Sequence, residues 1–244
     1  MRRPSPFGAV LLALGTLLAS SLMSTAAQAA NVSAQDVSAQ DVSAQDVSAQ
    51  AGPSASALLA KLTSCAQISS GKYRSDEETA ANIPVCGKTG AVWYKADLDI
   101  DCDGKRTAKC SESTDPWFQP DTAFHDSKGQ PLQADKLPYV VVPSPSGTWD
   151  YRKFGIQGGG IVAVIYNNKV EYAVVGDTGP TAIIGEASYA AAVNLGINPN
   201  PANGGTDGPV HYIYFKNSKV SPIEDHAKAT SQGEALAQQF LSQN

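Results

Sequence analysis

Four segments between residues 138 and 217 are rich in Val, Ile and Tyr, and Gly, Pro or Asn bounds each of them: PYVVVP (138–143), GIVAVIYNN (160–168), VEYAVVGD (170–177) and PVHYIYFKN (209–217). This composition and punctuation are typical of β-strands. Asn167 and Asn168 lie between two of these segments, and Asn tolerates the positive φ that a tight hairpin turn requires. Short strands linked by glycine-rich loops predict a mainly β domain with a few helices, built as a small β-barrel.

Three helices are expected around these strands. Residues 56–68 carry Leu58, Leu59 and Leu62 on one side, which predicts a short amphipathic helix. A second helix is expected over residues 186–195, closed by Gly196, and a third over residues 224–241.

The N-terminal residues divide the chain before the domain begins. Residues 1–30 have a basic start, an apolar stretch and a small-residue run, AQAA, which together predict a secretory signal peptide. A membrane anchor is the weaker alternative, because serines interrupt the apolar stretch. Residues 31–52 repeat the polar pentapeptide VSAQD, which predicts a disordered spacer, with a cell-wall tether as the alternative. Residues 53–244 remain for one catalytic domain, which we expect to be extracellular.

The cysteines agree with an exported protein. The chain has four, at positions 65, 86, 102 and 110, and an even number in a secreted chain predicts two disulfides. Three pairings are possible, and we favour Cys65 with Cys86 and Cys102 with Cys110, because both close modest loops. Zinc is the alternative, but the spacings include no CxxC pair and the histidines are distant in sequence.

The charge balance argues against nucleic acid or a membrane surface as a partner. The chain carries 18 Lys and Arg against 23 Asp and Glu, and the acids concentrate in KADLDIDCDG (95–104) and in residues 177–186. If both acidic segments line one groove, that groove would attract a cationic substrate. The alternative is that both are solvated loops.

Two carboxylates stand at a glycine-rich turn within VVGDTGPTAIIGEASYA (174–190). Asp177 follows an apolar strand and is expected at the barrel rim, and Glu186 is expected in the first turn of a helix. Both positions have ordinary structural explanations. Asp177 would cap an Asx-turn, and an acid at a helix N-terminus is stabilised by about 0.3–1 kcal/mol. Spacing alone therefore does not establish catalysis.

The order of motifs resembles glycoside hydrolase family 75, the chitosanases. KADLDIDCDG, YVVVPSP, FGIQGGGIVAVIYNNKVEYAVVGDTGPTAIIGEAS and GGTDGPVHYIYFKNS carry the resemblance, which extends from about Leu58 to Lys219. The DTG turn also looks like the rim of double-psi β-barrels, found in lytic transglycosylases, family 45 endoglucanases and expansins, so the fold implied is a small double-psi-like β-barrel. The activity implied is endo-hydrolysis of β-1,4-linked glucosamine in chitosan, with inversion and without a cofactor.

The same resemblance implies that Asp177 and Glu186 are the catalytic carboxylates. Inversion needs one protonated group and one ionised group that activates a water. By analogy with the barrel relatives we favour Asp177 as general acid, and a helix N-terminus would favour an ionised Glu186 as general base. We expect a monomer with no metal.

Substrate contacts are expected around this pair. Asp99 or Asp101 would bind the ammonium groups of the polymer, and Thr178 adjoins the catalytic turn. Sugars commonly stack on aromatic rings, and we favour Trp149 and Tyr151 among the available candidates, which also include Trp93, Trp117 and Tyr172. An alternative for the alternating aspartates at 97, 99, 101 and 103 is the start of a calcium loop, although its closing bidentate Glu is missing.

Two other functions suit the same barrel. A peptidoglycan lytic transglycosylase would need one acid and no activated water, and a wall protein resembling expansins would bind polysaccharide without cleaving it. A nucleophilic triad is not indicated, since GxSxG is absent from the sequence.

Overall fold

The computed structural model describes residues 52–244, so the secretory signal and, apart from Gly52, the spacer lie outside the described residues. The elements in chain order are α1 (Ala55–Leu59), β1 (Ala66–Gln67), β2 (Cys86–Lys88), β3 (Ala91–Asp101), β4 (Tyr139–Pro143), the 3-10 helix η1 (Tyr151–Phe154), β5 (Ile161–Tyr166), β6 (Lys169–Gly179), β7 (Glu186–Ser188), α2 (Tyr189–Leu195), β8 (Thr206–Phe215) and α3 (His226–Gln243). Within residues 52–244, no helix has both the length and the apolar character that a membrane crossing requires.

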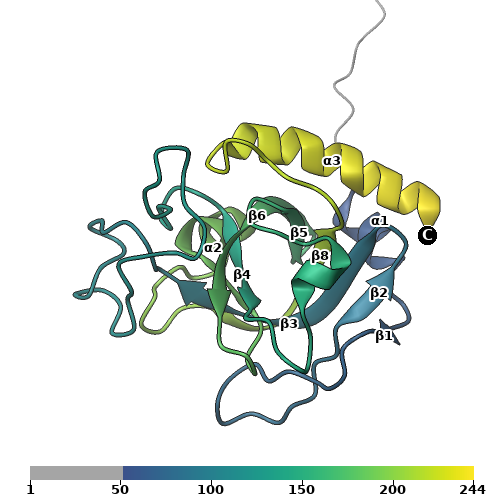
Figure 1. The fold of residues 1–244 in the computed structure, drawn as a ribbon, viewed down its shortest axis with the longest axis horizontal. Coiled ribbons are helices and arrows are strands. Elements are labelled where there is room, and N and C mark those ends of the chain that lie inside the picture. The colour runs from purple at the N-terminus through teal and green to yellow at the C-terminus, as the bar shows by residue number, and fades with distance from the viewer. Residues whose placement is uncertain (1–51) are drawn as a thin grey trace, which may run out of the picture. The chain divides into compact units, whose positions relative to one another are not determined.

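Six of the strands close into a barrel (Figure 1). Their order is β3, β7, β4, β6, β5 and β8, and β8 pairs with β3 to complete the ring. The pairs β3–β7 and β4–β6 are parallel, whereas the other neighbours are antiparallel. β1 and β2 continue the sheet beyond the edge of β3. The predicted fold class, mainly β with a few helices and a small double-psi-like barrel, is confirmed.

The barrel strands are buried on both faces. Side chains alternate along a strand, so Val162 and Val164 belong to the core inside the barrel, while Ile161 and Ile165 belong to a second core that α3 covers. Figure 1 shows α3 lying across the outside of the barrel. Burial on both faces explains why these segments are continuous apolar runs instead of alternating ones.

The hairpin between β5 and β6 confirms the expected turn. Tyr166 pairs with Lys169, and the two residues between them, Asn167 and Asn168, have φ values of 44° and 63°. Positive φ at both positions is the requirement of a two-residue hairpin turn, and Asn is among the few side chains that adopt it readily.

All three helices differ in their bounds from the prediction, the third by two residues at each end (His226–Gln243 against 224–241). The first covers only Ala55–Leu59, because the chain is extended again at Ala66–Gln67, where it pairs with β2. The second begins at Tyr189, because the Ser188 side chain accepts a hydrogen bond from the Ala191 N–H and caps it. Glu186 therefore lies in strand β7, and its expected place in a helical first turn is wrong.

The acidic segment at residues 95–104 was not predicted as a strand, yet most of it forms the second half of β3. Ala96 and Leu98 point into the barrel core, so the aspartates at 97, 99 and 101 share the opposite face. The four aspartates of the proposed calcium loop therefore do not surround one ion: Asp97 and Asp99 group with Asp76, whereas Asp101 and Asp103 group with Asp177, so a continuous calcium loop is not formed.

Both favoured disulfides are present, Cys65–Cys86 and Cys102–Cys110. The first joins the segment after α1 to β2, and the second closes the loop that follows β3. All four cysteines are paired, which removes the zinc alternative.

Candidate active site

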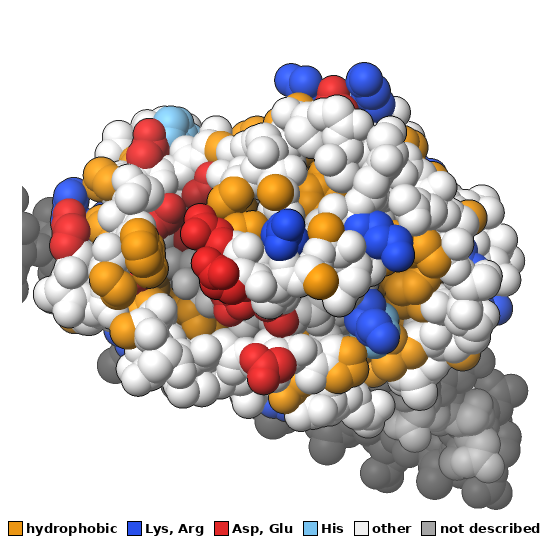
Figure 2. All heavy atoms as spheres, turned by 90° about the horizontal axis from the view of Figure 1, so that it is seen from below, with side chains coloured by type: hydrophobic (Ala, Val, Ile, Leu, Met, Phe, Trp, Pro, Cys, Tyr) orange, Lys and Arg blue, Asp and Glu red, His pale blue; other side chains and the backbone are white. Residues whose placement is uncertain are grey.

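A cleft of about 640 Å³ opens where the ends of β3 and β6 meet the start of β7. Its wall includes seven carboxylic acids and no Lys, Arg or His: Asp76, Asp99, Asp101, Asp103, Asp115, Asp177 and Glu186. Figure 2 shows acidic side chains gathered in a band along a hollow in one face. The two acidic segments of the sequence thus do line one groove, and neither is simply a solvated loop.

Asp177 is held at the rim by the irregular pairing of β6 with β4. Val140 pairs with Val175 and Val141 with Asp177, so Gly176 is an extra residue in β6. A Cβ on Gly176 would lie 2.6 Å from Tyr139 Cβ, which requires glycine there. The Asp177 side chain is buried, and its Oδ1 accepts hydrogen bonds from the N–H groups of Ala123 (2.8 Å) and Thr178 (2.6 Å). Burial raises the pKa of Asp177, and these two hydrogen bonds oppose the rise.

Glu186 reaches the same rim from β7. It pairs with Asp99 of β3. A Cβ built on Gly179, the last residue of β6, would lie 2.7 Å from the Oε2 atom of Glu186. Burial, followed by repulsion from Asp99 and Asp103, raises the pKa of Glu186 to about 7. Within residues 52–244, no hydrogen-bond donor reaches its carboxylate. The two predicted catalytic residues therefore meet at one cleft, in different environments.

A first group of carboxylates, which we call the hydrogen-bonded cluster, consists of Asp101, Asp103 and Asp177, with an oxygen of each within 4.8 Å of the others. Asp101 Oδ1 accepts from the Asp103 N–H (2.7 Å) and the Tyr139 hydroxyl (3.1 Å). Asp103 Oδ1 accepts from the Gln119 N–H (2.6 Å). Each member thus has at least one donor that stabilises its negative charge.

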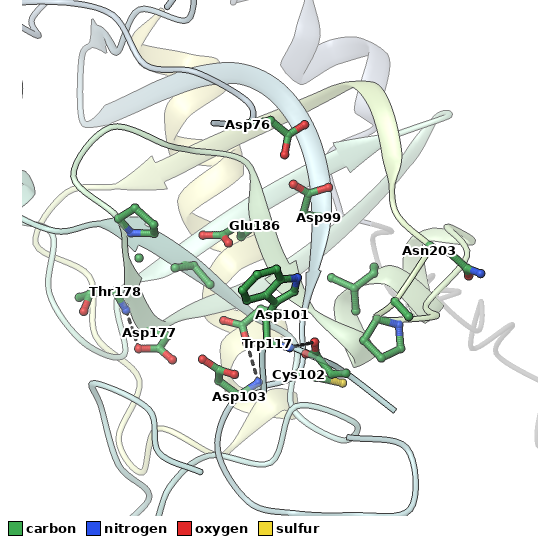
Figure 3. A pocket seen from close by; sticks show the side chains of 18 residues that line it. Asp76, Asp99, Asp101, Cys102, Asp103, Trp117, Asp177, Thr178, Glu186 and Asn203 are labelled. Carbon is green, nitrogen blue, oxygen red and sulfur yellow. Dashed lines mark hydrogen bonds between the residues drawn. The ribbon is translucent and has the colours of Figure 1, made fainter. Parts of the chain in front are cut away.

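A second group, the open cluster, consists of Asp76, Asp97 and Asp99, again with oxygens within 4.8 Å of one another. Figure 3 shows Asp76 and Asp99 facing each other at one end of the cleft, with Glu186 between them and the hydrogen-bonded cluster. Burial, followed by repulsion from neighbouring aspartates, raises the pKa of Asp97 to about 7 and that of Asp99 to about 6. Sequence reasoning missed Asp76, which comes from a loop far from β3 and has no motif around it.

The structure brings together only part of the expected substrate-binding set. Asp99, Asp101 and Thr178 line the cleft. Trp149 and Tyr151 do not, because they are packed against each other in the barrel core with ring centroids 6.4 Å apart. Their placement at the cleft is corrected.

The aromatic side chain at the cleft is that of Trp117, whose residue is 82% exposed. A large apolar ring left this open on the surface is available to stack on a ligand. Sequence reasoning named it among five candidate aromatics, and the largely polar stretch around it, SESTDPWFQPD (111–121), was the signal that could have distinguished it from the core.

Comparisons with known proteins identify a family for most of the described chain. The profile of a family described as fungal chitosanase of glycosyl hydrolase group 75 matches residues 98–242, which include Asp177 and Glu186. Endo-chitosanase B of Aspergillus oryzae is 31% identical over 62% of this chain and 65% of its own length. An endo-chitosanase of Aspergillus fumigatus is 28% identical over 51% of this chain and 58% of its own length. The chain thus spans less than two thirds of these relatives.

Among solved structures, the Streptomyces papain inhibitor is 17% identical, covers 55% of this chain and 100% of its own, and has a TM-score of 0.31. The family profile matches residues 98–242, which is more than half of the sequence. The chain belongs to the family of fungal chitosanases of glycosyl hydrolase group 75.

Proposed function

We propose that this protein is a secreted endo-chitosanase that hydrolyses β-1,4-linked glucosamine polymers by inversion, with Asp177 and Glu186 as its acid–base pair. The observation that carries the proposal is a cleft whose charged side chains are all acidic and which contains both carboxylates at one rim. Family membership supports it, since the relatives are endo-chitosanases. Two disulfides favour the extracellular location expected from residues 1–30.

The acidic wall suits a cationic polymer. Glucosamine units carry ammonium groups, and seven carboxylic acids without a basic neighbour in the wall would concentrate such a chain in the cleft. Asp101 and Thr178 lie beside the catalytic pair, and Trp117 offers a face for a sugar ring. A neutral polymer such as chitin would gain nothing from this charge.

The environments of the two carboxylates favour Glu186 as general acid and Asp177 as general base. Glu186 lies between other acids with no donor within residues 52–244, and its pKa of about 7 keeps it protonated in mildly acidic solution. Asp177 has two backbone N–H donors that stabilise its ionised form. This reverses the assignment favoured from the sequence, which rested on analogy with the barrel relatives and on a helix N-terminus at Glu186, whereas Glu186 lies in β7 and α2 begins at Tyr189.

In the resulting reaction Asp177 takes a proton from a water as that water attacks the anomeric carbon. Glu186 gives its proton to the glycosidic oxygen as the bond to the leaving sugar breaks. The two roles require a separation of roughly 6.5–9.5 Å between the carboxyl groups, with the water on the side of Asp177.

The test is to incubate the protein with chitosan, chitin and peptidoglycan and to measure new reducing ends. Chitosan alone should be cleaved, and the Asp177→Asn and Glu186→Gln variants should each lose about 10²–10⁴-fold in rate while remaining folded. Glu112→Gln, on the exposed surface outside the cleft, is the matched control and should keep full activity. Anhydro products from peptidoglycan would favour a lytic transglycosylase, and binding of chitosan without new reducing ends would favour a wall protein.

A further inference from the structure

The open cluster differs from the hydrogen-bonded cluster in having nothing to offset its charge. Within residues 52–244, no ion pair reaches the carboxylates of Asp76, Asp97 or Asp99, although one oxygen of each lies within 4.8 Å of those of the other two. Arg74 and Lys95 are the basic residues closest in sequence, but the Arg74 guanidinium donates to the Thr79 carbonyl and, in the described part of the chain, Lys95 forms no ion pair with these acids. Carboxylates held this close are either protonated or bound to a cation.

Asp97 supplies the independent observation. It is only 8% exposed, and its Oδ1 is buried without a hydrogen-bond partner in the described part of the chain. On one side the Gly185 backbone packs so closely that a Cβ there would stand 2.1 Å from this oxygen. Buried carboxylate oxygens are normally paired or bound to a metal. Asp97 thus has a buried, unpartnered Oδ1, and one of its carboxylate oxygens lies within 4.8 Å of oxygens of Asp76 and Asp99.

The scaffold holds the three aspartates in place without a ligand. The segment before Asp76 is tied to the rim by the Arg74 N–H to Ala182 O bond (3.0 Å) and the Ile184 N–H to Arg74 O bond (3.0 Å). Asp99 donates its own N–H to Gly185 O (2.8 Å). These backbone bonds bring a loop and a strand together, so the site is already assembled.

We propose that Asp76, Asp97 and Asp99 bind a calcium ion at this end of the cleft. Calcium binds oxygen ligands at about 2.3–2.6 Å, so two oxygens bound to one ion are at most about 4.6–5.2 Å apart, and three carboxylate oxygens that all lie within 4.8 Å of one another can reach the same ion. Magnesium requires a tighter octahedron at about 2.0–2.1 Å and releases its waters reluctantly. The proposal does not depend on the proposed hydrolase activity.

The geometry favours an ion over an ammonium group of the polymer. Asp76 and Asp99 line the cleft, but Asp97 does not and lies behind them. A bare ion can contact all three carboxylates, whereas an amino group on a sugar ring in the cleft would contact only those of Asp76 and Asp99. Two positive charges also offset most of the charge of three carboxylates. Asp99 is therefore assigned to the ion and no longer to substrate ammonium.

The test measures calcium binding to the EDTA-treated protein by isothermal titration calorimetry and by the midpoint of thermal unfolding, Tm. We expect one ion per chain, with a Kd on the order of 10⁻⁴ M, as in extracellular calcium modules. At about 100 Kd of calcium, Tm should rise by about 5–10 °C. Asp97→Asn and the exposed Asp76→Asn should each weaken binding at least about tenfold, whereas Asp103→Asn, from the hydrogen-bonded cluster, should bind as the wild type does.

Three results would overturn the proposal. One is calcium binding that is the same in the wild type and in Asp76→Asn, a variant that leaves the buried residues intact. Another is an equal rise in Tm with magnesium chloride at the same ionic strength, which would indicate screening in place of a site. The third is a rise in Tm with glucosamine hydrochloride that is lost in Asp97→Asn, together with no rise with calcium. This would identify the ligand as an ammonium group.

Discussion

Replacing Glu186 by Gln is expected to stabilise the protein at alkaline pH while it removes activity. The pKa of Glu186 rises from 4.5 to about 7 on folding, mainly because burial disfavours the ionised carboxylate. A group whose folded pKa is raised stabilises the protein below its unfolded value, and that contribution is lost as pH rises through the folded value. Wild-type stability should therefore decline between about pH 4.5 and 7, whereas an uncharged Gln removes this dependence.

The size of the effect follows from the shift. A rise of between two and three pKa units, at about 1.4 kcal/mol each, gives roughly 3 kcal/mol at pH 9, where Glu186 must be ionised, against about 1 kcal/mol at pH 5. The stability difference between the Gln variant and the wild type should thus grow by about 2 kcal/mol or more between pH 5 and pH 9.

Urea denaturation followed by fluorescence at both pH values, with EDTA present, measures this difference. Glu112→Gln serves as the control, because Glu112 is exposed and paired with Arg106, and it should show no such growth. A difference between Glu186→Gln and the wild type that is the same at pH 5 and pH 9 would refute the reasoning, since it would mean that Glu186 titrates normally in the folded protein.

Three further predictions concern the cleft and its support. The pH profile of kcat/KM should fall above about pH 7 as Glu186 loses its proton. Asp103→Asn should move this fall to lower pH, because Asp103 repels the ionised form of Glu186; a fall at the same pH as in the wild type would show that Asp103 does not influence the Glu186 proton. Trp117→Ala should raise KM for chitosan several-fold and leave Tm unchanged, because the residue is 82% exposed; equal kinetics would exclude stacking. Replacing Cys65 and Cys86 by Ala should cost about 3 kcal/mol in urea denaturation, since the disulfide spans a sequence separation of 21; a loss under about 1 kcal/mol would contradict this.

Local signals were sufficient for most of the barrel. Val, Ile and Tyr runs bounded by Gly, Pro and Asn predicted four of the strands, and Asn167 with Asn168 predicted the turn between two of them. The second half of β3 was missed because aspartates are rare in strands, although their alternation with Ala96 and Leu98 has the two-residue period of one. Asp99 and Asp101 are tolerated there because they line a cleft and not the core.

Site residues that belong to a sequence motif could be predicted, whereas residues that only the folding of the chain brings to the cleft could not. Asp177 and Glu186 follow from the resemblance, and Asp99 from the acidic run. Asp76 reaches the cleft through backbone bonds between distant segments, which no spacing reveals. Trp149 was assigned to the wrong place because an aromatic residue looks the same in sequence whether it fills a core or faces a ligand.

The most direct test of the central claim is proton NMR of the first product released from a fully deacetylated glucosamine hexamer. If Asp177 activates a water while Glu186 protonates the leaving oxygen, the new reducing end appears first as the α anomer, inverted from the β linkage. A first product with the β configuration would contradict this account, because it would require a covalent sugar–enzyme intermediate in place of a water held between base and substrate.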